Sequence, residues 1–246
     1  MKKIKLSLVA MLLIGAVACK KSNGTLPPVS NVTNDEAADM VAGSLSLNSN
    51  GVASLSADAS LNAAVIINTP GACGTIRSDS ISRQSKPGDP VTYNYNLKYS
   101  FTVNCDGGRP DSLLSTLTYS GSFSGPNLSS SNSGSSVFMV NGLLPRFTDF
   151  VINGEFKRAG SFSSKIDTAH HGNSNIDIVI NSLTVEKSSR TIVSGNAAIS
   201  ITGDVPKKGS FTYTGTLVFN GNGTATLTLN GTVYIINLES GDRRRV

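Results

Sequence analysis

The sequence predicts a mainly β protein: a large curved antiparallel meander sheet or open barrel of about nine or ten strands, with an N-terminal helical segment. Three observations predict this fold. Ser, Thr and Asn make up 78 of the 246 residues, a polar but uncharged bias that argues against a helical bundle. Apolar side chains recur at every second position over long stretches. Short turns rich in Gly and Asn separate these stretches, and connections this short join antiparallel neighbours.

The first 19 residues read MKKIKLSLVAMLLIGAVAC. Lysines at positions 2, 3 and 5 precede an apolar segment of 12 residues, Leu6 to Val17, which is too short to span a hydrocarbon core of about 30 Å as a helix. Small residues follow it. This order of basic, apolar and small residues predicts a secretory signal peptide over residues 1–18 rather than a membrane-spanning helix.

The segment Ala16-Val17-Ala18-Cys19 resembles the lipobox of bacterial lipoprotein precursors, although that class usually has Leu where Ala16 stands. The resemblance implies that Cys19 is acylated and becomes the new N-terminus. It further implies a lipid-anchored protein of the bacterial cell envelope, with the outer membrane as the expected location and its periplasmic or surface side left open. The alternative is an ordinary signal peptide cut after Ala18, with Cys19 an incidental thiol.

Residues 19–32 are polar and contain Pro27-Pro28, so they predict a lipidated N-terminus and flexible tether. Residues 33–246 are expected to form a single β-rich domain. Without the three lysines of the signal peptide, the chain has 18 basic and 16 acidic residues. This near balance argues against a nucleic-acid partner. The three arginines 243–245 near the end of the chain are interpreted as a solvated tail.

A helical segment is predicted over about residues 33–66. Thr33 or Asn34 can cap the first N–H groups, and Asp35 and Glu36 favour the positive end of the helix dipole. An apolar stripe follows, consisting of Ala37, Met40, Val41 and Leu45. A second helix is expected from about Val52 to Ala64, because this segment is rich in Ala and Leu.

From Gly74 onward the pattern has a period of two. It is clearest from Tyr93 to Cys105, where apolar and aromatic side chains take the odd positions and Asn, Lys, Ser and Thr the even ones. Similar alternation covers 193–201 and 211–219. Between Ile176 and Val185 the alternation shifts by one residue, which predicts a β-bulge near Asn181-Ser182. The segment Ser129 to Ser136 is interpreted as a loop or a polar strand edge.

Cys73 and Cys105 remain after Cys19 is assigned to the lipid. An even pair in an exported protein predicts a disulfide. The bridge would join the end of the helical part to the first long hairpin. No C-x-x-C spacing is present, so a redox role is not expected.

Catalytic motifs are not found, and the protein is expected not to be an enzyme. His170 and His171 are adjacent, so in a strand their side chains would point to opposite faces and make a poor metal pair. No H-E-x-x-H, Cys/His cluster or G-x-S-x-G occurs. No catalytic residue, metal site or cofactor is therefore predicted, although a Ser-His-Asp triad can assemble from distant residues.

Two classes of binding function remain. In the first, the concave face of the sheet holds an apolar or lipid-like ligand, as in lipocalins and lipoprotein carriers, and Tyr93, Tyr95, Tyr99 and Phe101 line the site. This is the preferred hypothesis. In the second, a cell-surface interaction or adhesion protein contacts glycans or partner proteins through its polar Ser/Thr/Asn face. The oligomeric state is left open.

Three short segments resemble an O-glycosylation sequence of bacterial envelope proteins, Asp-Ser/Thr-apolar. They are Asp79-Ser80-Ile81, Asp111-Ser112-Leu113 and Asp167-Thr168-Ala169. The resemblance implies that Ser80, Ser112 and Thr168 are modified.

Overall fold

The computed structural model describes residues 32–246, in which two α-helices and a 3-10 helix precede eleven strands. The helices are α1 (Asn34–Leu45), η1 (Leu47–Ser49) and α2 (Val52–Ile67). The strands are β1 (Ile76–Gln84), β2 (Thr92–Asp106), β3 (Arg109–Ser124), β4 (Leu128–Asn141), β5 (Asp149–Ser164), β6 (His171–Glu186), β7 (Ile192–Val205), β8 (Gly209–Gly221), β9 (Thr224–Leu229), β10 (Thr232–Asn237) and β11 (Arg243–Arg245).

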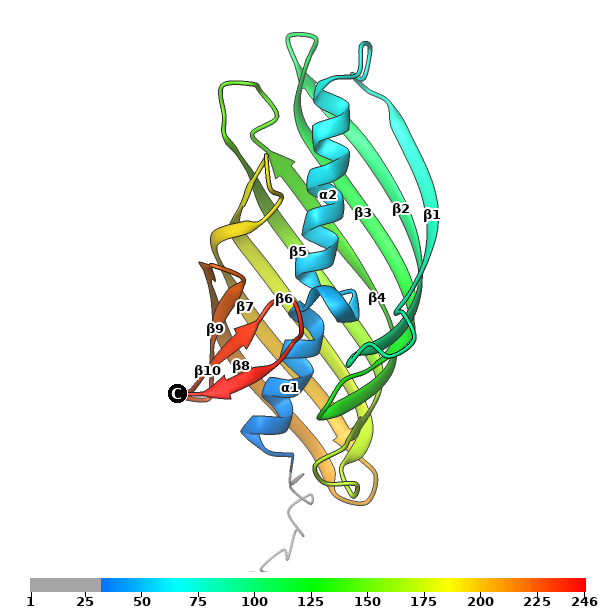
Figure 1. Cartoon of the computed structure of the whole chain (residues 1–246), viewed down its shortest axis with the longest axis vertical. Helices are drawn as coiled ribbons and strands as arrows, with labels where there is room; N and C mark the ends of the chain where they lie inside the picture. Colours follow the sequence, from blue (N-terminus) through cyan, green and yellow to red (C-terminus); the bar gives the residue numbers. More distant parts are fainter. Residues whose placement is uncertain (1–31) are drawn as a thin grey trace, which may run out of the picture.

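All the described strands form one antiparallel sheet, in which each strand pairs with its neighbours in the chain. β1 and β11 are the two edges, so the sheet is open rather than closed into a barrel. Figure 1 shows the sheet curving around α1 and α2, which lie one above the other against its concave side. The predicted meander with an N-terminal helical segment is therefore confirmed, with one strand more than the upper expected number.

The helices begin where the sequence predicts. Thr33 caps α1: its hydroxyl accepts a hydrogen bond from the Glu36 N–H at 3.2 Å, and the Glu36 carboxylate accepts one from the Thr33 N–H at 3.0 Å. This reciprocal pair satisfies two N–H groups that the first helical turn leaves free. Between the helices, Asn50 adopts the left-handed conformation (φ 54°). The chain then continues into α2, which ends three residues beyond the predicted end at Ala64.

The concave side of the sheet is filled by the helices. Ala37, Val41, Leu45, Val52, Ala59 and Ala63 are each no more than 1% exposed and belong to the same hydrophobic core as the inward side chains of the sheet. The largest of those inward side chains are Tyr95, Phe138, Phe150, Phe156, Phe219 and Tyr234. The apolar face of the long strands packs against the helices, and the opposite face is exposed to solvent. This difference between the two faces explains the period of two in the sequence.

β2 follows the predicted alternation closely. Leu97, Phe101 and Val103 are buried, and Lys98 between the first two is exposed. The bulge is confirmed in β6, where the pairing with β7 shifts after Asn181 and Ser182 takes a φ of 53°.

The Ser-rich segment 129–136 was interpreted incorrectly as a loop or strand edge. It belongs to β4, which is paired on both sides. Its inward positions are filled by Ser130, Asn132, Gly134 and Ser136. These are small or polar side chains, so the apolar alternation that marks the other long strands is absent here.

The arginines 243–245 form β11 rather than a solvated tail. They pair with β10, and the guanidinium of Arg243 donates hydrogen bonds to both carboxylate oxygens of Asp39 on α1, at 2.8 and 3.0 Å. A solvated tail was expected because the arginines lie near the end of the chain, but Asp39 and Asp35 on α1 supply the opposing charge for Arg243.

Cys73 and Cys105 lie at disulfide-bonding distance, with 5.6 Å between their Cα atoms. The bridge joins the segment after α2 to the end of β2, as the sequence predicts. No helix in residues 32–246 is sufficiently long and apolar to serve as a membrane span.

Candidate functional site

The side of the sheet that faces away from the helices, here the outer face, is dominated by Ser, Thr and Asn. Strand register places these side chains in rows that cross the strands. One row contains Asn94, Ser122, Ser131, Ser161 and Asn173, each directly paired with the next across β2 to β6. The adjacent row contains Asn96, Ser120, Ser133, Ala159 and Asn175. Neighbouring members of a row are separated by the strand spacing of about 4.8 Å.

These rows are hollowed into shallow depressions. The larger has a volume of about 790 Å³ and is lined by Thr92, Tyr93, Asn94, Ser122, Phe123, Ser124, Ser129, Ser130, Ser131, Ser161, Phe162, Ser163, His171, Gly172 and Asn173. A second, of about 580 Å³, lies beside it and shares Asn94, Ser122 and Ser131. We call the two together the outer hollow. Apart from His171 and three aromatic residues, it is lined by Ser, Thr, Asn, Gly and Ala, without a carboxylate, lysine or arginine.

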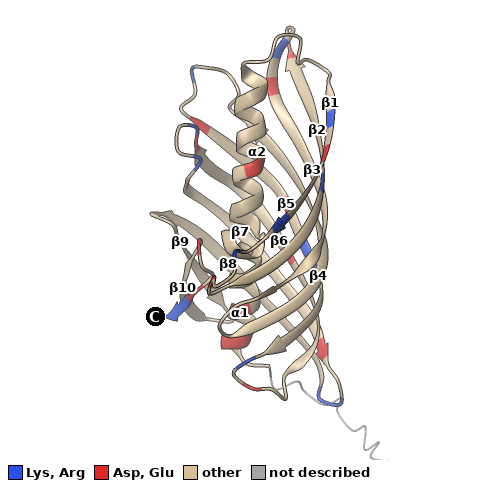
Figure 2. Ribbon diagram, turned by 45° about the vertical axis from the view of Figure 1, so that its right-hand side comes forward, with Lys and Arg blue, Asp and Glu red and all other residues tan. Residues whose placement is uncertain are grey.

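Charges on the outer face lie next to this hollow. Figure 2 shows few coloured segments along the middle of the sheet. Lys157 on β5 is 2.8 Å from a Glu155 oxygen and 3.9 Å from an Asp177 oxygen. The hydrogen bond to Glu155 raises the pKa of Lys157, while burial and the nearby Glu155 charge raise the pKa of Asp177. These opposite charges partly offset one another and lie outside the hollow.

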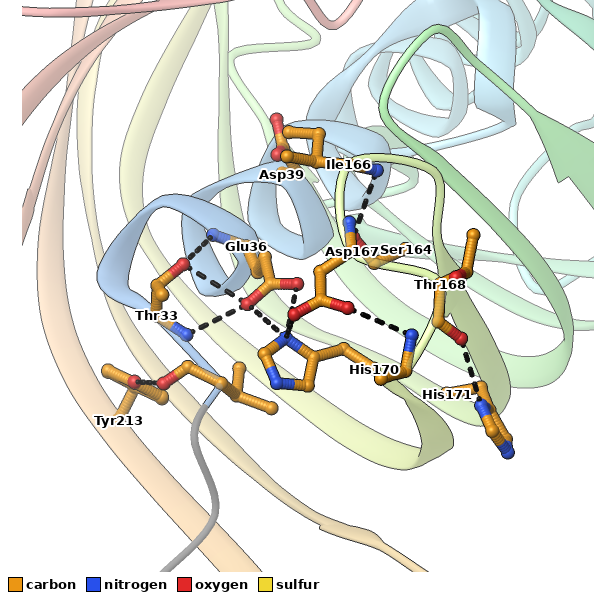
Figure 3. Close-up of polar contacts among 12 residues, drawn as sticks. Thr33, Glu36, Asp39, Ser164, Ile166, Asp167, Thr168, His170, His171 and Tyr213 are labelled. Carbon is orange, nitrogen blue, oxygen red and sulfur yellow. Dashed lines mark hydrogen bonds and ion pairs between the residues drawn. The ribbon is translucent and has the colours of Figure 1, made fainter. Parts of the chain in front are cut away.

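A second group of polar residues lies at the start of α1, as Figure 3 shows. His170, in the loop between β5 and β6, places Nδ1 2.8 Å from Glu36 Oε1 and 3.0 Å from Oε2. Asp167 Oδ2 is 3.6 Å from the same nitrogen. His170 and Glu36 are both 5% exposed, so the pair is enclosed by protein.

Burial opposes the charged form of Glu36, but hydrogen bonds from the Thr33 N–H and from His170 and Ser164 outweigh it and lower the pKa of this carboxyl. The arrangement differs from a nucleophile with its base. The Ser164 hydroxyl contacts the Glu36 carboxylate rather than the His170 imidazole, and it accepts hydrogen bonds from the N–H groups of Ile166 and Asp167. The geometry therefore suits a clamp between α1 and the β5–β6 loop.

A third polar group, which the sequence analysis missed, fixes the junction between the helices. The guanidinium of Arg158 on β5 is buried and donates to the carbonyl oxygens of Gly43, Ser49 (2.8 Å) and Asn50 (3.2 Å). The rings of Tyr119, Phe123 and Phe156 surround it, with centroids 5.4 to 5.8 Å from its Cζ atom. A sequence signal existed, because Arg158 has the same parity as Phe156 and Phe162 and must point inward.

The residues predicted to line an apolar site lie mostly on the concave side, against the helices. Tyr95 and Phe101 are buried, and the Tyr95 hydroxyl donates to the Asn132 side chain at 3.3 Å. Tyr93 has the same inward parity as Tyr95, is half-buried and packs against the core, and it also borders the outer hollow.

Tyr99 is held by a helix. Its hydroxyl donates to Asp58 on α2, whose carboxylate also binds Arg83 at 2.7 Å. Burial and the Asp58 charge raise the pKa of Tyr99. The tyrosine therefore serves the contact between β2 and α2.

The three predicted glycosylation residues differ in accessibility. Ser80 is exposed on the edge strand β1, and Thr168 is exposed in the β5–β6 loop. Ser112 is buried at 7% exposure, and its hydroxyl accepts a hydrogen bond from Asn104. Cys19 lies outside the described residues. In residues 32–246, no three side chains of His, Cys, Asp or Glu gather as metal ligands would.

Comparisons with known proteins do not assign this chain to a family. A scan of protein-family models, a search of curated proteins and a search of solved structures each found no match.

Proposed function

We propose that the protein is a lipid-anchored envelope protein, without enzymatic activity, that binds a neutral glycan in the outer hollow. The observation that carries this proposal is the polar lining of the hollow, which lacks carboxylates, lysines and arginines. Its hydroxyl and amide groups repeat across five adjacent strands in fixed register. A neutral polysaccharide presents hydroxyl groups at regular intervals, and each of these both donates and accepts hydrogen bonds, as do Ser, Thr and Asn side chains.

The rigidity of the hollow supports the same function. Its side chains stand on β2 to β6 of an eleven-stranded sheet, whose opposite side is packed against α1 and α2. Ser and Asn have few rotatable bonds, so little side-chain entropy is lost when a ligand binds. Strongly charged ligands are less well matched, because the lining contains no carboxylate, lysine or arginine that could oppose their charge.

The apolar-ligand hypothesis receives less support from the geometry. The concave face, where such a ligand was expected, is occupied by helices whose inward side chains are buried. An apolar ligand there would have to displace α2, and so break the contacts of Asp58 with Arg83 and Tyr99.

The lipid anchor remains a proposal based on Ala16-Val17-Ala18-Cys19. An acyl group on Cys19 would attach the protein to the envelope, with the outer membrane as the expected location. Intact mass of the membrane fraction should show an acylated Cys19, and Cys19→Ser should release the protein. A Cys19→Ser chain that fractionates like the parent would contradict the anchor.

Glycan binding is tested with the whole protein and soluble neutral polysaccharides of different backbones: dextran, laminarin, xylan and mannan. We expect one of them to retard the protein in native affinity gels and to release or absorb heat on titration. Polygalacturonate, which is acidic, serves as the matched charged probe and should bind more weakly. Absence of binding to all neutral probes, or stronger binding of the acidic one, would count against the proposed function.

A further inference from the structure

The end of the sheet at which α1 begins differs from the rest of the surface. The turn after β3, the loop after β5 and the turn after β7 gather there, as Figure 1 shows at its lower end. The described chain enters at the same end: the hydroxyl of Tyr213 on β8 donates to the Val32 carbonyl oxygen. Any anchor at Cys19 is therefore attached to this end of the molecule.

The loop between β5 and β6 presents an apolar side chain at this end. Ile166 is 63% exposed, with exposed Lys165 beside it. The Lys165 backbone N–H donates to the Asn127 carbonyl oxygen at 2.7 Å, and the Ile166 N–H donates to the Ser164 hydroxyl at 3.3 Å. The Lys165 ammonium donates to the Gly125 carbonyl oxygen at 2.6 Å, a neutral partner that leaves its charge uncompensated. The exposure of Ile166 is therefore a feature of an ordered loop.

The turn between β7 and β8 presents two lysines. Lys207 is exposed and Lys208 half-buried, after exposed Pro206. Within the part of the chain that the structure describes, neither ammonium group lies within ion-pair distance of a carboxylate. Two acidic residues lie nearby: Asp167, whose carboxylate accepts a hydrogen bond from the Ala169 N–H at 2.9 Å and lies 3.6 Å from His170 Nδ1, and exposed Asp204 before the turn.

We propose that this end, comprising Ile166, Lys165, Lys207 and Lys208, docks on an anionic lipid surface; the inference rests on the proposed anchor at Cys19. The 13 residues from Cys19 to Asn31 can span at most about 45 Å, so the anchor alone leaves the body free to tilt and to move away from the membrane. Lysines bind anionic head groups and an exposed Ile enters the acyl boundary, and together they hold the sheet upright. The outer hollow then opens sideways, with its edge at Ser124, Ser163 and His171 next to the docking end.

The test uses acylated protein extracted from membranes and reconstituted in phosphatidylcholine vesicles with or without phosphatidylglycerol. Ile166→Cys carries a nitrobenzoxadiazole label, and Ser188→Cys in the β6–β7 turn at the opposite end carries the same label as a control. Both positions are exposed, so both variants should fold. The bridged Cys73 and Cys105 and the acylated Cys19 leave the new thiol alone to react.

We expect lipids brominated in the acyl chain to quench the label at position 166 but not at 188, and only when phosphatidylglycerol is present. Lys207→Gln and Lys208→Gln should each lower the docking equilibrium about fivefold. Equal quenching at both positions, or quenching of the same extent with and without phosphatidylglycerol, would overturn the inference. A sugar found on Thr168 of vesicle-bound protein would also overturn it, because Thr168 lies in the docking loop. Acylated protein that is bound but unquenched would refute docking alone, whereas extracted protein that carries no acyl group and stays off the vesicles would refute the anchor as well.

Discussion

Glu36 and His170 are separated by 134 residues in the chain, yet their side chains meet at 2.8 Å and join the first turn of α1 to the β5–β6 loop. Both are buried, and Thr33 completes the contact by donating its N–H to the same carboxylate. This clamp fixes the helix that fills the concave face of the sheet. It therefore supports the packing behind the outer hollow without belonging to that hollow.

Removing the Glu36 charge should destabilise the protein in a pH-dependent way. The folded-state pKa of Glu36 lies below its usual value of 4.5, so its contribution is fully present above that pH and is lost as the pH falls through the folded-state value. Glu36→Gln should reduce the free energy of unfolding by about 1.5–3 kcal/mol at neutral pH. Urea unfolding should show this difference shrinking in acid. A difference that stays constant with pH would contradict the role of the charge.

Arg158 should be needed for the junction of the helices. Arg158→Met keeps much of the apolar stem but leaves the carbonyl oxygens of Gly43, Ser49 and Asn50 without this donor. We expect a loss of about 3–5 kcal/mol in the free energy of unfolding, because a buried polar network is broken on one side. The exposed Lys157 next to it provides the control, since Lys157→Met should leave the free energy of unfolding nearly unchanged. Equal losses would show that Arg158 is not a clamp.

Replacing either of two buried serines of α2 should not destabilise the protein, in contrast to the substitutions of Glu36 and Arg158. Ser60 is fully buried, and within the described residues its hydroxyl has no hydrogen-bond partner. Ser60→Ala should leave stability unchanged or raise it by about 1 kcal/mol, because the desolvated hydroxyl is removed and Ala favours the helix. Ser56→Ala should behave in the same way. A clear loss in thermal unfolding of either variant would indicate a bridging water or another partner.

The two sides of β2 should respond differently to truncation. Leu97→Ala and Phe101→Ala remove side chains that are 1% and 4% exposed and should cost about 2–5 kcal/mol. Asn96→Ala and Ser100→Ala on the outer face should cost about half a kcal/mol or less. Chemical denaturation of the four variants makes the comparison. Equal costs on both sides would contradict the assignment of the inner and outer faces.

Local patterns in the sequence predicted most helices and strands, whereas their packing against one another depends on contacts between residues distant in the chain. The alternation from Tyr93 to Cys105 indicates a half-buried strand, because a period of two places every apolar side chain on one side. Thr33 or Asn34 as a cap, followed by Asp35 and Glu36 in the first turn, indicates a helix start. The apolar face alone did not distinguish a cavity from a packed core. That outcome depends on where α1 and α2 lie, which local periodicity does not encode.

The parts that were missed depend on partners distant in the chain. β11 was taken for a tail because it lies near the end of the chain, and the contacts of Arg243 with Asp39 and Asp35 on α1 are not encoded locally. The serines 129–136 lack the apolar alternation of a strand. Small inward residues are nevertheless required in β4, because large side chains from nearby strands occupy the space: a Cβ atom at Gly134 would lie 2.5 Å from the Tyr119 hydroxyl oxygen. The rows of the outer hollow became visible only with the strand register.

The most direct test of the account compares two lysine substitutions on the outer face. Ser131→Lys places a long charged side chain in the middle of the outer hollow, whereas Thr214→Lys places the same side chain on β8, outside it. Both positions are exposed, so both variants should remain folded. Each is titrated with the neutral polysaccharide that the unmodified protein binds. We expect Ser131→Lys to weaken binding at least about tenfold, which corresponds to about 1.4 kcal/mol, and Thr214→Lys to leave it unchanged. Equal affinity of the two variants would contradict the assignment of the outer hollow as the binding site.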